Sequence, residues 1–376
     1  MKILYVTAFP NEYFKKAISQ NNKVSGLAVQ KFNSTFINGF VKNKNDISIL
    51  CPRDIMAEEI EKKTRFKWQT IIENDIQYLF PPTSPNKYLR KILRTFSLKR
   101  YLIHFYKQNP DGIVIMDVLS PCADIIHSVA KNKCYIATDL SNNPEEHQKH
   151  ASMYKMLSEA DYLVLLSSQM REVIDMQNVK DSIVIQGVAD VQTESEINKK
   201  RIILFSGTLN ESNGISNLIE AFSRLNTNYE LHFYGTGSSV KTIQNCNIKN
   251  VKYMGTVSND IMVKKQKEAL ILVNPRPINQ DFVAFSFPSK LIEYLASGTA
   301  TISTKLSCIT SDYDDYLLYF KDDTVNGLYD SLNQLVNLPE RELIDIGKKQ
   351  QNFVLENKSN IIQAKKVLDM ISKNLI

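Results

Sequence analysis

The feature that most constrains this chain is an alternation of short apolar runs with helical stretches, which stops at a polar segment and then starts again. Runs that are apolar at nearly every position indicate strands buried on both faces of a parallel sheet. The first series lies at 2–8, 47–51, 76–80, 112–117, 134–138, 162–166 and 182–187, and the second at 201–207, 230–235, 251–255, 270–274 and 299–304. The pattern predicts an α/β protein with two doubly wound sheets.

The polar segment ADVQTESEINKK at 189–200 is the predicted linker, because it is charged and has few large apolar residues. A length of 376 residues also exceeds what one ordinary hydrophobic core holds. We expect an N-terminal domain at 1–192, a second domain at 198–355 and a last helical segment at 356–376. Ligands of such sheets bind beyond the carboxyl ends of the strands, so two facing domains would share a cleft.

The segment FSFPSKLIEYLASGTAT at 285–301 indicates a helix whose amino end can bind phosphate. Pro288 suits a first helical turn, Ser289 suits the cap, and the N–H groups of the opening turn attract an anion. Lys290 adds positive charge there, and Glu293 can accept hydrogen bonds from the hydroxyls of a ribose. A nucleoside diphosphate would satisfy both groups. The alternative is a plain amphipathic helix that packs its apolar face inward and ends at Gly298.

Four further motifs precede this helix: SGTLNESNGISNLIEAF at 206–222, FYGTGS at 233–238, YMGTVSND at 253–260 and LVNPRP at 272–277. Together they resemble the C-terminal half of family 4, or group 1, retaining glycosyltransferases, which have the GT-B fold of two facing Rossmann-like domains. The resemblance is specific over about residues 200 to 305 and weaker before. It implies sugar transfer from a nucleotide-diphosphate sugar without a metal or other cofactor, and a last helix that returns to the N-terminal domain.

The resemblance implies a diphosphate site at Gly207, where a glycine lets the backbone approach a phosphate. In the family an arginine follows this glycine and a lysine precedes the next one, whereas this chain has Thr208 and Asn213 there. Arg276 is the expected substitute, because it is a planar bidentate donor fixed between two prolines, and Lys290 is the second. A structural ion pair is the alternative for Arg276.

Only one of the family's two paired glutamates is present in this chain. Glu293 matches the second, which binds the ribose, while Phe285 stands at the first, which in the family touches the donor sugar. The resemblance places Gly235 and Val257 near the donor base, although a lone G-x-G after a strand is a weak signal. Ser25 and Gly26 match the family's N-terminal glycine loop, which caps the diphosphate; a tight turn explains that glycine equally well.

Two aspartates follow strands of the N-terminal half, namely Asp117 and Asp139. Asp139 better matches the family position near the reacting sugar and the acceptor, and either residue can instead cap the next helix. We therefore expect Asp139, Arg276 and Lys290 to be catalytic, the two cations by stabilising the departing diphosphate. Two other functions remain open: a non-catalytic GT-B partner subunit, as Thr208, Asn213 and Phe285 suggest, or a nucleotide-sugar epimerase.

The stretch 86–107 carries seven Lys or Arg and no acidic residue. Tyr88, Leu89, Ile92, Leu93 and Phe96 recur at helical spacing beside these charges, as in helices that lie on anionic lipid. This suggests a lipid-linked acceptor at the inner membrane face. The alternatives are a solvated helix whose apolar stripe faces the core and, less favoured because no groove-reading motif is present, a nucleic-acid surface.

The remaining features bound the location and the chemistry. No run of residues is apolar and long enough to span a membrane, and the N-terminal MKILYVTAF suits a buried strand better than a signal peptide, so we expect a cytoplasmic protein. Five scattered cysteines argue against a disulfide framework and against zinc. Asp312-Tyr313-Asp314 is a D-x-D motif, which in another glycosyltransferase fold holds manganese, but here we expect a solvated acidic loop.

Overall fold

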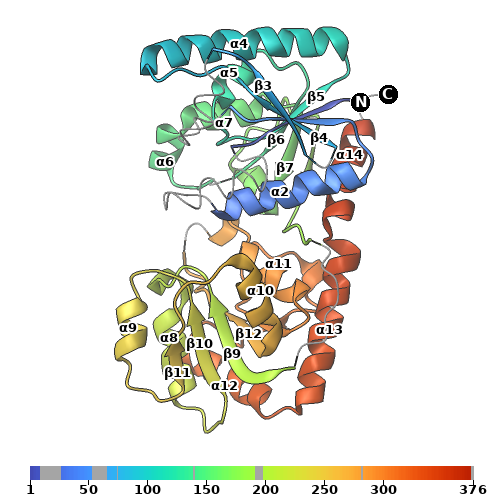
Figure 1. Cartoon of the computed structure of the whole chain (residues 1–376). Helices are drawn as coiled ribbons and strands as arrows, with labels where there is room; N and C mark the ends of the chain where they lie inside the picture. The colour runs from blue at the N-terminus through green and yellow to red at the C-terminus, as the bar shows by residue number, and fades with distance from the viewer. Residues whose placement is uncertain are drawn as a thin grey trace. The chain divides into compact units, whose positions relative to one another are not determined.

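The computed structural model describes residues 1–8, 27–52, 66–73, 75–138, 140–190, 198–280 and 283–373, with the side chains of 27–30 left aside. Contacts divide the chain into two compact units, Met1–Val188 with Asn360–Ile376, and Ala189–Ser359. The first unit is therefore discontinuous in sequence, since the chain leaves it after Val188 and returns at Asn360 (Figure 1).

The first unit is built on a sheet in which eight described strands run in the order β3-β4-β2-β1-β5-β6-β7-β8. All neighbouring strands are parallel except the β3/β4 pair at one edge. The strands are β1 (Ile3–Val6), β2 (Ile47–Leu50), β3 (Gln69–Glu73), β4 (Ile76–Phe80), β5 (Ile113–Asp117), β6 (Lys133–Ile136), β7 (Tyr162–Leu165) and β8 (Asp181–Val184).

Helices lie on both sides of this sheet, with α4 (Lys87–Gln108) on one side and α2 (Leu27–Lys42) and α14 (Asn360–Lys373) together on the other (Figure 1). The contact between α2 and α14 is close: a Cβ on Gly39 of α2 would overlap the backbone oxygen of Asn360. The remaining helices are α5 (Ala123–His127), α6 (Pro144–Lys149), α7 (Ala151–Ser158) and the 3-10 turn η1 (Ser168–Glu172).

The second unit has a fully parallel sheet, in which the described strands run in the order β11-β10-β9-β12-β13-β14. They are β9 (Lys200–Ser206), β10 (Glu230–Tyr234), β11 (Val251–Tyr253), β12 (Ala269–Asn274), β13 (Ala300–Ser303) and β14 (Leu318–Tyr319). The helices are α8 (Ile215–Ser223), α9 (Val240–Asn245), α10 (Asn259–Glu268), α11 (Ser289–Ala296), α12 (Val325–Val336) and α13 (Glu340–Asn357), with 3-10 turns η2 (Glu211–Asn213), η3 (Val283–Phe285) and η4 (Ser311–Tyr313).

The strand order of both sheets has the reversal that defines a doubly wound fold, because β1 lies between β2 and β5, and β9 lies between β10 and β12. Every strand expected from the sequence is present, within a few residues of its expected bounds. Two strands were not expected. The edge strand β3 alternates in burial and is antiparallel to β4, and β14 spans only two residues.

Candidate active site

The site expected in the second unit lies at the carboxyl ends of its central strands, where the loops after β9 and β10 are held together. The Gly207 N–H donates to the Tyr234 carbonyl and the Leu209 N–H to the Thr236 carbonyl, both at 2.8 Å. Gly207 and Gly235 have φ of +139° and +133°, which side chains rarely adopt. A Cβ on Gly235 would also overlap the Gly207 oxygen, so these glycines allow the two loops to touch.

Helix α11 begins beside the same strand end. The Ser206 N–H donates to the hydroxyl oxygen of Tyr294 at 2.7 Å, and that hydroxyl contacts the Ser206 carbonyl at 3.1 Å. Tyr294 is buried, and its hydroxyl ties the helix to the end of β9. This contact was not expected from the sequence, because an aromatic residue on the inner face of an amphipathic helix gives no sign that its hydroxyl is used.

The start of α11 differs by one residue from the expectation. Pro288 stands at the N-cap with extended backbone angles (φ −70°, ψ 100°), Ser289 is the first helical residue, and no side chain caps the helix. The expectation that Ser289 caps is therefore wrong: the extended conformation needed at the helix entry falls on Pro288, whose ring already fixes φ. Ser289 is exposed at the opening turn, where the Leu291 N–H donates to the Pro288 carbonyl at 2.9 Å and the N–H groups before it have no acceptor one turn earlier in the helix.

Lys290 extends from this turn over the loop after β9. Its Nζ lies 5.1 Å from the centre of the Phe205 ring and occupies the space in which a Cβ of Gly207 would stand. Burial, as the largest cause, and the charge of Arg276 together lower the pKa of Lys290 to about 8, although the nearby Glu293 acts in the opposite direction. A lysine held against a glycine loop beside a second cation is well placed to bind an anion, because an anion would relieve this repulsion.

Arg276 follows β12 and lies against the segment that leads into α11. Its Nη1 donates to the Ser286 carbonyl at 3.5 Å, and burial lowers the pKa of its guanidinium. The Cys308 thiol contacts the same segment, since its Sγ lies 3.6 Å from the Ser286 carbonyl oxygen. Phe285, which stands where the family has its first glutamate, is only 5% exposed and ends the turn η3.

The loop that lacks the family's arginine and lysine is closed on itself. Asn213 Nδ2 donates to the Thr208 carbonyl at 2.8 Å, while the Thr208 side chain is exposed. Gly214 has φ +74°, and a Cβ there would overlap the Pro275 oxygen, so this loop also touches the residue before Arg276. Asn213 therefore stabilises the loop through a neutral hydrogen bond, and the positive charge comes from Arg276 and Lys290.

The structure brings most of the expected donor-binding residues to one end of the sheet. Gly207, Gly235, Lys290, Arg276 and Ser289 lie on the loops and turn just described. Glu293 is half-buried one turn into α11.

Val257 is 37% exposed in the loop after β11, which is joined to Gly235 by a 2.8 Å bond from the Gly235 N–H to the Gly255 oxygen. The roles of these residues stay predictions.

The expected residues of the first unit are largely outside the described ranges. Ser25, Gly26 and Asp139 are not described. Asp117, at the end of β5, is buried and accepts 2.8 Å hydrogen bonds from the Thr138 hydroxyl and the Leu119 N–H. Its carboxylate therefore fixes the backbone beside it and the residue before Asp139, as a local turn does.

The D-x-D motif is part of the framework of the second unit. Asp312 pairs with Lys358 at 2.6 Å, and Asp314 pairs with Lys305 at 3.1 Å and accepts from the Tyr319 hydroxyl at 2.8 Å. In the described ranges, no three His, Cys, Asp or Glu residues group closely enough to hold a metal ion. Of the helices described, none combines the length and the apolar character needed to cross a bilayer.

Residues 200–337 match the family described as Glycosyl transferases group 1. No curated protein matches the sequence. Sucrose-phosphate synthase from Thermosynechococcus elongatus is similar in structure with a TM-score of 0.66 at 11% identity, over 100% of this chain and 99% of that one.

Two further solved structures are similar over nearly the whole chain. A TarM variant from S. aureus, in complex with fondaparinux, alpha-GlcNAc-glycerol and UDP, has a TM-score of 0.67 at 12% identity, over 99% of this chain and 100% of that one. The lipopolysaccharide outer core galactosyltransferase WaaB has a TM-score of 0.58 at 19% identity, over 99% of both chains. The expected GT-B fold and the group 1 glycosyltransferase resemblance of residues 200–337 are thereby confirmed.

Proposed function

We propose that this protein transfers a sugar from a nucleotide-diphosphate sugar to a glycan or lipid-linked acceptor. The GT-B fold and the match of residues 200–337 to group 1 glycosyl transferases support this proposal. The observation that carries the proposal is the position of Lys290, half-buried on Gly207 beside Arg276 and at the opening turn of α11. This arrangement supports a diphosphate at the carboxyl ends of β9 and β10. UDP in the TarM complex supports a nucleotide of this class.

The proposed chemistry is mainly electrostatic. As the bond between sugar and diphosphate breaks, negative charge grows on the leaving oxygen, and Lys290, Arg276 and the α11 amino end stabilise it. No metal ion or cofactor is required in this proposal, because those groups supply the positive charge. The acceptor attacks the face from which the diphosphate leaves, so the configuration at the sugar is retained. The leaving phosphate takes the acceptor's proton, and Asp139 orients the acceptor.

The proposed acceptor belongs to surface-polysaccharide assembly, and the protein would work on the cytoplasmic side of the membrane. WaaB, which is named for transfer to the lipopolysaccharide outer core, supports an acceptor of this kind. Sucrose-phosphate synthase has the same fold, so the acceptor has to be found by experiment.

Thermal-shift measurements with nucleoside diphosphates test the proposed donor site. A ligand at a hundred times its Kd stabilises the native state by about 2.7 kcal/mol, which gives a clear rise in Tm. Gly207→Ala should weaken this binding at least about tenfold, since the new Cβ displaces Lys290 from the loop. Gly298→Ala is the matched control: its φ is also positive at +74°, but its Cβ would approach only the Gln351 side chain, beyond the far end of α11.

Equal loss of binding in both variants would trace the effect to backbone strain and remove the support for the site. Catalysis is tested separately, by release of nucleoside diphosphate from sugar donors with membrane-extracted acceptor. Binding without release would indicate the non-catalytic partner subunit. The anomeric configuration of the product, measured by NMR, tests retention.

A further inference from the structure

Helix α4 exposes the apolar stripe that its sequence predicts, so this stripe does not face the core of the first unit. The side chains of Ile92, Phe96 and Ile103 are 66%, 65% and 63% exposed, and Tyr88 at the start of the helix is 81% exposed. The helix instead packs on its own unit through another set of residues, Leu98, Leu102, Phe105 and Tyr106. The helix is thus apolar on two faces, and one of them is open to solvent.

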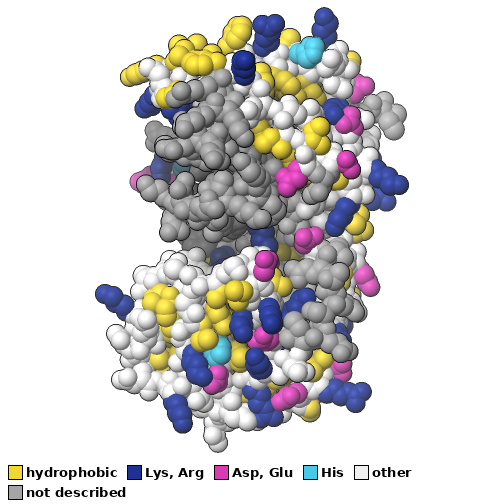
Figure 2. All heavy atoms as spheres, in the orientation of Figure 1, with side chains coloured by type: hydrophobic (Ala, Val, Ile, Leu, Met, Phe, Trp, Pro, Cys, Tyr) yellow, Lys and Arg dark blue, Asp and Glu magenta, His cyan; other side chains and the backbone are white. Residues whose placement is uncertain are grey.

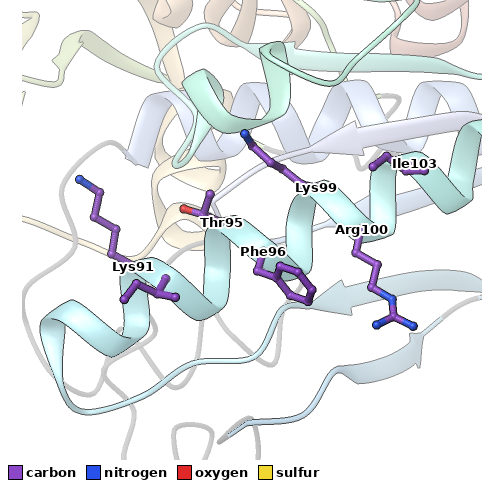
Figure 3. A pocket seen from close by; sticks show the side chains of 7 residues that line it. Lys91, Thr95, Phe96, Lys99, Arg100 and Ile103 are labelled. Atoms are coloured by element: carbon purple, nitrogen blue, oxygen red, sulfur yellow. The ribbon is translucent and has the colours of Figure 1, made fainter.

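The spacing of the exposed residues makes them one continuous surface. Ile92, Phe96 and Ile103 follow one another at intervals of four and seven residues, which places them on one face of a helix. With Lys91, Thr95, Lys99 and Arg100 they line a shallow hollow along α4 (Figure 3). Figure 2 shows hydrophobic side chains together with Lys and Arg over this helix, at the top of the view.

The cations on this helix are available for an external partner. Arg90 is committed to the helix start, where it donates to the Ser84 carbonyl at 2.6 Å and the Pro85 carbonyl at 3.0 Å. The exposed cations are a different set: Lys87, Lys91, Lys99, Arg100 and Lys107. Among the residues that the structure describes, the side chains of these five form no ion pair or hydrogen bond, and α4 itself has no acidic residue.

We propose that α4 docks flat on an anionic lipid bilayer. Ile92, Phe96 and Ile103 enter the boundary between headgroups and acyl chains, while Lys91, Lys99 and Arg100 reach outward to lipid phosphates. Tyr88 lies where its hydroxyl can remain among the headgroups. This docking rests on the proposed function and extends it, because α4 becomes the surface through which the enzyme reaches a lipid-linked acceptor.

Charge complementarity favours this partner over a second copy of the chain. Two copies joined through α4 would place like charges against each other on both sides of the apolar stripe, without an acid on the helix to compensate. An anionic bilayer instead satisfies the apolar residues and the cations at once. Single-stranded nucleic acid would use the cations but would leave Ile92 and Ile103 against phosphates, so it is the outcome to be excluded.

Vesicle co-sedimentation of the full chain, without donor or acceptor, tests the proposal. We expect binding to equal mixtures of phosphatidylcholine and phosphatidylglycerol, and little binding to phosphatidylcholine alone. Replacing two charges, Lys99→Gln with Arg100→Gln, should lower partitioning about 10- to 30-fold. The matched control is Lys241→Gln with Lys249→Gln, two exposed lysines of the second unit, which should leave binding unchanged.

The apolar stripe needs its own variant. Ile92→Ser with Phe96→Ser should lower partitioning about tenfold or more, while Ile72→Ser, at a 72% exposed residue of β3, should not. The depth of position 96 in the bilayer is measured by tryptophan fluorescence in the variant Phe96→Trp with Trp68→Phe. Brominated lipids should quench the fluorescence of this tryptophan, but not that of the control variant Ile72→Trp with Trp68→Phe. Unchanged melting temperatures show that each variant is folded.

Several outcomes would overturn the proposal. They are equal binding to neutral and anionic vesicles, no loss in the Lys99/Arg100 variant, or no loss in the Ile92/Phe96 variant. Binding of single-stranded RNA that the same variants abolish, in place of vesicle binding, would assign the surface to nucleic acid. Nucleotide thermal shifts are measured without lipid, so the donor site and the lipid surface can fail independently.

Discussion

Lys290 and Lys199 both have a pKa of about 8, and their surroundings separate the lysine proposed to bind the diphosphate from a structural one. Burial is the largest cause in each. Lys199 lies just before β9, where its Nζ donates to the Ala269 carbonyl at 3.1 Å and the Thr299 hydroxyl at 2.5 Å. Lys290 instead lies at the opposite end of the strand, over Gly207. A lowered pKa therefore identifies a binding lysine only together with its position.

The lowered pKa of Lys290 predicts pH-dependent nucleotide binding. Without ligand, this pKa is about 8 against an ordinary 10.5, so the unfolded state binds more protons between these values and stability rises with pH there. A bound diphosphate favours the charged lysine and raises its pKa, so binding takes up a proton above pH 8. We expect UDP affinity to fall between about pH 8 and pH 9.5, as measured by titration calorimetry in buffers of different ionisation enthalpy.

Lys290→Gln is the control for this titration, and its weaker UDP affinity should be flat over the same range. A wild-type affinity that does not change with pH would contradict the assignment of Lys290 to the diphosphate.

At the residue scale the sequence predicts which residues the structure brings to one end of the second sheet better than it predicts their local geometry. Local motifs indicate Gly207, Lys290 and Arg276, because the need for a glycine and the presence of a fixed charge are both visible in the sequence. The cap at Ser289 was misplaced, since both Pro288 and Ser289 fit the entry of a helix and local pattern does not separate adjacent positions. The Tyr294 contact with Ser206 joins residues 88 positions apart, which no local pattern encodes.

Among the elements, α4 shows what periodicity leaves undecided. The pattern correctly indicates a helix, but it contains two apolar stripes, and only packing against the rest of the unit shows that Leu98, Leu102 and Phe105 are the buried ones. Strand β3 was missed for a related reason: its alternate residues are exposed, so it lacks the continuous apolar run that marks the other strands.

The contact between η4 and the end of α13 carries a prediction on stability. Lys358 has a side chain only 6% exposed, lies 4.6 Å from the centre of the Tyr313 ring and pairs with Asp312, whose side chain is 49% exposed. Asp312→Asn leaves a buried ammonium without its counter-charge and should cost about 2 kcal/mol. Lys358→Met retains the packing against Tyr313 and leaves a half-solvated carboxylate, so it should cost less than about 1 kcal/mol.

Urea unfolding of both variants measures this difference. Burial alone would raise the pKa of Asp312, but the hydrogen bonds from Lys358 and Thr310 outweigh it and lower the pKa below its ordinary 3.8. The wild-type advantage over Asp312→Asn should therefore be present at neutral pH and disappear as pH falls below about 4. Equal costs for the two variants would show that the buried ammonium is not the determining group.

For the whole molecule, the two-sheet architecture followed from the restart of the strand pattern, because each series of apolar strands needs helices of its own to cover it. Periodicity alone does not determine which helix completes which core; the return of the last helix to the N-terminal domain is implied only by the family resemblance. Residues of α14, among them Ala364, Val367 and Met370, are buried with β1 and α2 in the core of the first unit, across more than 300 positions of sequence.

This connectivity predicts that the second unit folds in isolation and that the continuous part of the first unit does not. Residues 189–359 are continuous and contain their own sheet and cores, so they should fold alone and retain UDP binding. Residues 1–188 should not fold, because the missing helix removes four buried apolar side chains, the three larger of which are each worth about 1.5 to 3 kcal/mol, from a unit with a total stability of about 5 to 15 kcal/mol. Circular dichroism and urea unfolding of the two fragments check this.

Adding a synthetic peptide of residues 360–376 to the fragment 1–188 provides the control and should restore cooperative unfolding. A fragment 1–188 that unfolds cooperatively without the peptide would contradict the prediction.

The return of the chain at Asn360 also has a consequence for biosynthesis. A ribosome completes every strand of the second sheet before it makes the helix that closes the first core. The half of the protein that is translated first is thus the half whose core is completed last, and its apolar surface stays uncovered while the second sheet is being made.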